Sequence, residues 1–261
     1  MKNARTRNLS ALLTAAFILS ACGGGGSSGT TSTVTPPNLT GKAIDGYLAG
    51  ATVCLDLNNN NVCDAGELSA TTDANGSYGL NYAGDPSGKK LLVVVTPATK
   101  DNSRPGYTFP ASFTLSAIAD GSSGQNVTPL TTMVLSLIDS GQTRSAAEKA
   151  VASVVGSSVD LKSDYIANGD SSTATFASKV VDKVTQFAGS GNNADGMRAV
   201  MNAIVSKGDV DAVTQTDVDA AAKLPTYDAN IQASDLLNKT FYGYDQTEHP
   251  ESASAAMSAV R

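Results

Sequence analysis

The chain contains no tryptophan, one histidine and three cysteines among its 261 residues, and aromatic residues make up only 5% of it. So few aromatic side chains argue against a stacking platform for bases or sugars. The histidine, His249, lies beside Pro250 near the C-terminus, where we expect a solvated tail residue rather than a member of a catalytic triad. The sequence also has no phosphate-binding loop or dinucleotide fingerprint. These absences argue against an enzyme.

Basic residues are outnumbered, with 18 Lys and Arg against 24 Asp and Glu, and the net charge is −6. Three of the cations, Lys2, Arg5 and Arg7, lie at the N-terminus, and their removal takes the charge from −6 to −9. No basic cluster remains after that. Neither nucleic acid nor a purely electrostatic attachment to anionic lipid is therefore expected.

The N-terminal segment has the pattern of a processing signal. Basic residues precede the apolar stretch Leu9–Leu19, which is too short for an ordinary membrane-spanning helix. It ends in Leu19-Ser20-Ala21-Cys22, which resembles the lipobox of bacterial lipoproteins. The resemblance implies a signal peptide over residues 1–21, acylation of Cys22 with fatty acid such as palmitate, and a membrane anchor. An ordinary secretory signal with an incidental cysteine is the alternative.

Position 23 is Gly rather than Asp. By resemblance to the sorting of Gram-negative lipoproteins, this favours the outer membrane, with exposure at the cell surface as one outcome.

Lipidation at Cys22 would leave Cys54 and Cys63 as a pair. An exported protein folds in an oxidising compartment, so we expect these two cysteines to form a disulfide. Two buried free thiols are the alternative. Zinc is a weaker interpretation because two cysteines have no partner ligands.

Changes in pattern divide the chain into an α+β multidomain protein. Residues 22–40 are rich in Gly, Ser, Thr and Pro and indicate a flexible linker. Residues 41–128 alternate short apolar runs with turn signals, which predicts an all-β sandwich. Residues 129–248 have helical periodicity and predict an α-helical domain, followed by a tail over 249–261.

Within these regions, individual elements follow from local periodicity. Val53, Leu55 and Leu57 alternate with polar or small residues, as in a half-buried strand. Further strands are expected over Ser77–Tyr82, Leu91–Thr96 and Tyr107–Leu115. Helices are expected over Leu130–Ile138, Thr143–Val155, Thr175–Ala188, Ala194–Ser206 and Thr216–Lys223.

One segment, Asp56–Glu67, carries a chemical pattern. Numbered from one, it has oxygen-bearing side chains at positions one, three, five and nine and a glutamate at position twelve, which is the spacing of an EF-hand calcium loop. Calcium takes about six to eight oxygen ligands, and a tight loop can aim alternate side chains inward. A plain polar hairpin loop is the alternative. The candidate ligands are the side chains of Asp56, Asn58, Asn60, Asp64 and Glu67 and the main-chain carbonyl of Val62.

The segment departs from an EF-hand in two ways. The sixth residue is Asn61 where glycine is usual, although Asn tolerates the left-handed conformation better than other residues with a side chain. The flanking pattern is that of strands rather than helices. With three carboxylates, we expect moderate or weak calcium binding, which suffices outside the cell, where such modules bind at about 10⁻⁴–10⁻³ M. Magnesium is less expected because it prefers to keep its waters.

A wider pattern includes this loop. It consists of four stretches in this order: Gly50-Ala51-Thr52-Val53-Cys54-Leu55-Asp56, the Asn-rich stretch, Asp64-Ala65-Gly66-Glu67 and Thr71-Thr72-Asp73-Ala74-Asn75-Gly76-Ser77-Tyr78. The pattern resembles the calcium-binding B-type immunoglobulin-like domains of bacterial surface proteins, and its ending is similar to carboxypeptidase regulatory-like domains. The resemblance covers roughly 41–96. It implies a small β-sandwich in which calcium braces a loop, with Asp73 near the calcium ligands.

These patterns together predict an exported, lipid-anchored protein with a structural, adhesive or assembly role at the cell surface. Its partners would be the membrane, reached through Cys22, and a protein, a polysaccharide or further copies of itself. The alternative is a binding subunit that recruits a polysaccharide, a secreted enzyme or another envelope protein. An unrecognised hydrolase is a third, weaker interpretation.

Overall fold

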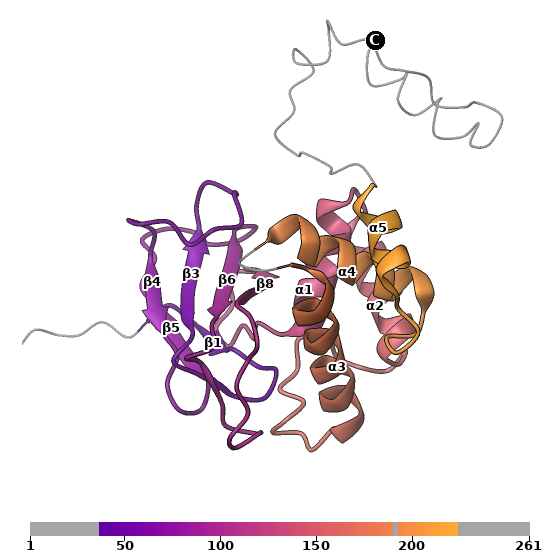
Figure 1. The fold of residues 1–261 in the computed structure, drawn as a ribbon. Coiled ribbons are helices and arrows are strands. Elements are labelled where there is room, and N and C mark those ends of the chain that lie inside the picture. Colours follow the sequence, from indigo (N-terminus) through magenta and orange to yellow (C-terminus); the bar gives the residue numbers. More distant parts are fainter. Residues whose placement is uncertain (1–36, 190–192, 224–261) are drawn as a thin grey trace, which may run out of the picture. The chain divides into compact units, whose positions relative to one another are not determined.

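The computed structural model describes residues 37–189 and 193–223 (Figure 1). The expected signal peptide, Cys22 and His249 lie outside these residues. None of the helices in the described ranges is long and apolar enough to cross a membrane.

The N-terminal part of the fold consists of antiparallel strands. β4, β3, β6 and β8 form one sheet in that order, and β1–β5 and β2–β7 form two-stranded pairs. The strands are β1 (Leu39–Lys42), β2 (Leu48–Ala49), β3 (Thr52–Asp56), β4 (Ser69–Thr71), β5 (Ser77–Leu80), β6 (Lys90–Val95), β7 (Lys100–Asp101) and β8 (Phe113–Ile118).

The strand β3 is buried on both faces, which corrects the expectation of a half-buried strand. Val53 and Leu55 face the core, but Cys54 and Asp56 on the opposite face are also almost completely buried. The following loop covers that second face, because Cys63 is bonded to Cys54 and Asp56 accepts hydrogen bonds from the loop backbone. The alternation of apolar and polar residues along the strand does not indicate that the loop covers its second face.

The C-terminal part of the described chain is helical. Each expected helix is present, and its ends lie within a few residues of the expected ones. α3 shows the largest difference: it begins four residues early because the Asp170 carboxylate accepts a hydrogen bond from the Thr173 backbone and caps the helix there. The helices are α1 (Pro129–Asp139), α2 (Arg144–Val155), α3 (Ser171–Phe187), α4 (Ala194–Lys207) and α5 (Gln215–Ala222).

Helix α1 connects the strands to the other helices. The Thr131 hydroxyl donates to the Ser116 carbonyl of β8 at 2.8 Å, and the Thr132 hydroxyl accepts from the Ser116 amide at 2.8 Å. Its other sides contact α2, α3 and α4. Buried side chains of sheet and helices form one continuous cluster from Leu39 to Ala221. The mixed α+β class is therefore confirmed.

The short strands β1, β2, β4 and β7 were not predicted. The first two residues of β1 fall at the end of the expected linker, yet Leu39 is completely buried and pairs with Leu80 of β5. Elements of two to four residues have too little periodicity to be recognised alone, and pairing with distant strands stabilises them.

Candidate calcium-binding loop

The candidate calcium loop joins β3 to β4, and Asp56 at the end of β3 organises it. Its Oδ1 accepts hydrogen bonds from the Asn59 amide at 2.6 Å and the Asn60 amide at 3.3 Å, and its Oδ2 accepts from the Asn61 amide at 2.9 Å. The carboxylate is only 2% exposed. Three backbone donors therefore fold the loop around one buried carboxylate.

Two asparagines let the backbone make this tight turn. Asn61, at the position usually occupied by glycine, has a φ of 61°, and Asn59 has a φ of 62°. Asparagine is the residue after glycine that best tolerates this left-handed region. The substitution of Asn for Gly at the sixth position is thus compatible with the loop conformation, and the second left-handed residue, Asn59, was not foreseen.

The side chains at the third, fifth and ninth positions converge on one oxygen. The Nδ2 groups of Asn58 and Asn60 each donate to Oδ2 of Asp64 at 2.8 Å. Their Oδ1 atoms accept from the backbone amides of Asn60 at 3.1 Å and Val62 at 2.9 Å. The sequence spacing therefore does bring these three side chains together.

Glu67, the twelfth residue, closes the loop. Its Oε1 accepts from the Leu57 amide at 2.8 Å and its Oε2 accepts from the Asp64 amide at 3.1 Å. One carboxylate thus connects the second and ninth positions. This is the reach across the loop that a closing bidentate ligand needs.

The donor chemistry of the loop fits calcium, and its present arrangement is held by hydrogen bonds. Three carboxylates, two amide oxygens and a carbonyl are hard oxygen ligands of the kind calcium takes. To present oxygen rather than nitrogen toward Asp64, the amides of Asn58 and Asn60 must turn over. Within 37–189 and 193–223, no three acidic, His or Cys side chains are already grouped to hold a metal. Binding calcium therefore requires local rearrangement.

The predicted disulfide is confirmed. Cys54 of β3 and Cys63 of the loop are bonded, with their Cα atoms 5.8 Å apart. The bond joins a fully buried strand residue to the second half of the loop. It restricts the loop independently of any metal.

The buried cation Lys90 connects the loop to the helices and was missed by sequence reasoning. It pairs with Asp56 in the β3–β6 register. Its Nζ donates to Oδ1 of Asn61 at 2.8 Å and to Oδ2 of Asp139, the last residue of α1, at 2.9 Å. The only local signal was a lysine at the start of an apolar strand, and its partners are 29 and 49 residues away.

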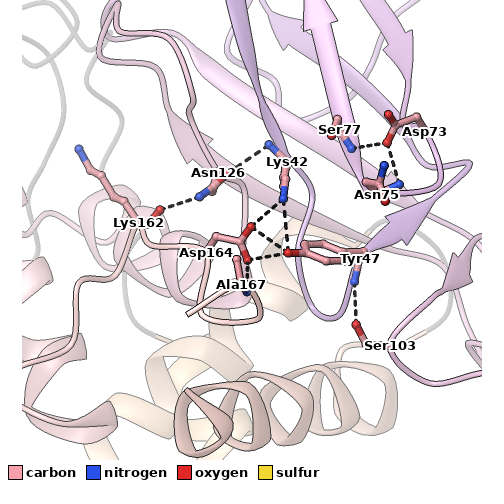
Figure 2. A network of polar contacts seen from close by, with 10 residues as sticks. All are labelled: Lys42, Tyr47, Asp73, Asn75, Ser77, Ser103, Asn126, Lys162, Asp164 and Ala167. Carbon is pink, nitrogen blue, oxygen red and sulfur yellow. Dashed lines mark hydrogen bonds and ion pairs between the residues drawn. The ribbon is translucent and has the colours of Figure 1, made fainter. Parts of the chain in front are cut away.

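Asp73 has another role in this structure. Its Oδ1 accepts from the backbone amides of Asn75 and Ser77, each at 2.8 Å, and so shapes the turn before β5 (Figure 2). Its recorded hydrogen bonds are therefore to this turn and not to the Asp56–Glu67 loop.

A second polar network ties the strand region to the segment between α2 and α3 (Figure 2). The Lys42 ammonium group forms an ion pair with Asp164 at 2.8 Å, and the Tyr47 hydroxyl donates to the same carboxylate at 3.0 Å. The pKa of Asp164 is lowered, because the hydrogen bonds and charge of its partners outweigh its partial burial. The network is a structural contact between distant parts of the chain.

A buried carboxylate pair lies nearby. Asp45 and Asp101 are each 2% exposed, and both are paired with the Arg104 guanidinium. Arg104 also donates to Ser178 of α3 at 2.9 Å and lies 4.0 Å from the Tyr107 ring centroid. Oδ1 of Asp45 has no hydrogen-bond partner in the described part of the chain. Burial raises the pKa of Asp45 to about 7, although the charge of Arg104 opposes the rise.

Comparison with known protein families, with curated proteins and with solved structures finds no match to this chain.

Proposed function

We propose that this chain is an exported lipoprotein whose Asp56–Glu67 loop binds calcium and thereby braces the strand region. The observation that supports the proposal is the convergence of Asn58 and Asn60 on Asp64, inside a loop that Glu67 closes. Asn58 and Asn60 lie six and four residues before Asp64 in the sequence, and their amide groups meet at one of its oxygens.

Calcium would add to a loop that is already organised. The three carboxylates give the loop a charge of −3, and a divalent cation between them relieves their mutual repulsion. Asn58, Asn60 and the Val62 carbonyl would complete the oxygen ligands. Because Lys90 joins Asn61 to Asp139, stiffening of the loop would also reach the end of α1.

In the cell, we propose a structural, adhesive or assembly role at the surface, with lipid on Cys22 as the anchor. The Cys54–Cys63 disulfide supports export, because structural disulfides persist in oxidising compartments. We further propose that the strand region is an immunoglobulin-like β-sandwich domain and the helical region a second domain packed on it. The anchor places both at the outer membrane.

The calcium proposal is tested by thermal unfolding of the chain, followed by circular dichroism. If the dissociation constant is about 10⁻⁴–10⁻³ M, about 5 mM calcium stabilises the folded state by roughly 1–2 kcal/mol. For a domain of this size, Tm should rise by roughly 2–8 °C. Magnesium at the same concentration should give a smaller rise.

Variants assign the effect to the loop. Asp64→Asn keeps the shape of a ligand while removing its charge and should reduce the calcium-dependent rise, and Asp56→Ala combined with Glu67→Ala should abolish it. Asp219→Ala removes an exposed carboxylate from α5 and serves as the matched control, which should respond like the wild type. If millimolar calcium leaves the Tm of the wild type unchanged, the proposal is contradicted.

The anchor is tested separately by metabolic labelling with a palmitate analogue. The wild type should incorporate the label and fractionate with membranes, and Cys22→Ala should do neither, because the thiol is the acylated group. Label retained by the Cys22→Ala variant would refute the assignment.

A further inference from the structure

A cavity lies between the strands and the first two helices, away from the calcium loop. It has a volume of about 610 Å³ and is bordered by the end of β8, by segments 120–126 and 157–162, and by α1 and α2. The two segments are tied together by the Asn126 amide, which donates to the Lys162 carbonyl at 2.9 Å (Figure 2). Ligand sites commonly have volumes of about 300–1,000 Å³, so the cavity is large enough for a small molecule.

The floor of the pocket is apolar. Ala117, Leu135 and Leu161 line it and are nearly completely buried. Polar groups in the wall are already satisfied: the Gln125 amide donates to the Ser122 carbonyl at 2.9 Å, and the Thr131 hydroxyl donates to the Ser116 carbonyl at 2.8 Å. A ligand body therefore meets hydrocarbon and needs no hydrogen bonds of its own at this depth.

The charged side chains on the two sides of the rim differ in whether they have partners. On one side, Lys162 forms an ion pair with Asp120 at 3.1 Å, and Asp160 accepts from the Lys162 amide at 3.0 Å. On the α2 side, Arg144, Glu148 and Lys149 line the pocket.

The α2 charges have no hydrogen-bond or ion-pair partner among the residues that the structure describes, and Arg144 and Lys149 are exposed. Glu148 offsets one of the two cations. The α2 side of the rim therefore keeps a net charge of +1, and the opposite side, with Asp120, Asp160 and Lys162, has a net charge of −1. An anionic group at the entrance is thus attracted to the two long side chains of α2.

We propose that this pocket binds a single acyl-chain amphiphile, with its chain over the Ala117–Leu135 floor and its carboxylate near Arg144 and Lys149. The apolar depth fits a hydrocarbon chain, and the unpaired cations at the entrance fit an anionic head group. This site is independent of the calcium loop and would give the chain a ligand-binding activity.

The test uses a dansylated undecanoic acid as a monomeric fluorescent probe, and its methyl ester as a neutral counterpart. The full chain should enhance the fluorescence of the acid at a stoichiometry of one, with saturation. Arg144→Gln combined with Lys149→Gln should weaken binding of the acid by about tenfold and leave binding of the ester nearly unchanged. Lys100→Gln removes an exposed cation from β7, outside the pocket, and should bind like the wild type.

A second set of variants fills the pocket and tests whether the probe binds inside it. Ala152→Trp places a large ring into the cavity from α2, and Ser157→Trp does so from an exposed position in the opposite segment. Both variants should keep the wild-type Tm within a few degrees and bind neither probe. Because the chain contains no tryptophan, each new ring also reports its own environment by fluorescence.

Two outcomes overturn the proposal. One is the absence of saturable binding to the wild type. The other is equal binding by the filled variants, which would place the probe elsewhere. Loss of binding in the filled variants, together with charge-selective weakening, supports the proposal.

Discussion

The buried carboxyl group of Asp45 should make the stability of this protein fall as the pH rises from about 4 to about 7. Burial is the chief cause that raises its pKa from the ordinary value of 3.8 to about 7 in the folded chain. Between these values the unfolded chain has released the proton and the folded chain still holds it. Folding therefore takes up a proton in this window, and raising the pH opposes folding. Above about pH 7, this contribution no longer changes.

The magnitude follows from the size of the shift. About three pKa units correspond to roughly 4 kcal/mol across the whole window, at about 1.4 kcal/mol per unit. The charged groups that act on Asp45 are Arg104, which lowers its pKa, and Asp101 and Asp182, which raise it. Burial thus raises the pKa of Asp45 more than the attraction to Arg104 lowers it.

The perturbation is Asp45→Asn, which removes the titration while keeping the shape of the side chain. Unfolding free energies of wild type and variant should be measured with urea between pH 4.5 and pH 8. The difference, variant minus wild type, should increase by roughly 3 kcal/mol over this pH range, because other titrating groups cancel. In melting experiments this corresponds to a relative gain on the order of 10 °C.

A pH-independent difference would refute this reasoning. A difference that decreases with pH would show that Asp45 is instead an ion-paired carboxylate with a lowered pKa. Asp219→Asn, on the exposed surface of α5, is the matched control and should show no comparable slope.

Two further predictions concern the loop and its link to the helices. Lys90→Met should destabilise the fold by roughly 1–3 kcal/mol in urea unfolding, because Asn61 and Asp139 lose their buried partner; an unchanged midpoint would contradict the role of that cation. The double variant Cys54→Ser, Cys63→Ser should lower the free energy of unfolding by about 2–3 kcal/mol and weaken the calcium-dependent rise in Tm. An unchanged response to calcium would show that the disulfide does not organise the loop.

The local features of this protein follow from short stretches of sequence. Helices α1 to α5 were predictable because their periodicity extends over eight residues or more and their capping residues are adjacent in the chain. The hydrogen bonding of the Asp56–Glu67 loop is local as well: the side chains of Asp56 and Glu67 accept from backbone amides within those twelve residues.

The sequence by itself determined the helices, the strands β3, β5 and β6, the pairing of Cys54 with Cys63 and the oxygen-rich loop, since each depends on residues close together along the chain. Only the tertiary structure decided which polar groups are buried together. Asp45 meets Arg104 across 59 residues, and Lys90 meets Asp139 across 49. Burial and charge pairing depend on what packs against a residue. The pKa of Asp45, the link from the loop to α1 and the pocket beside α2 therefore appear only after the strands and helices come together.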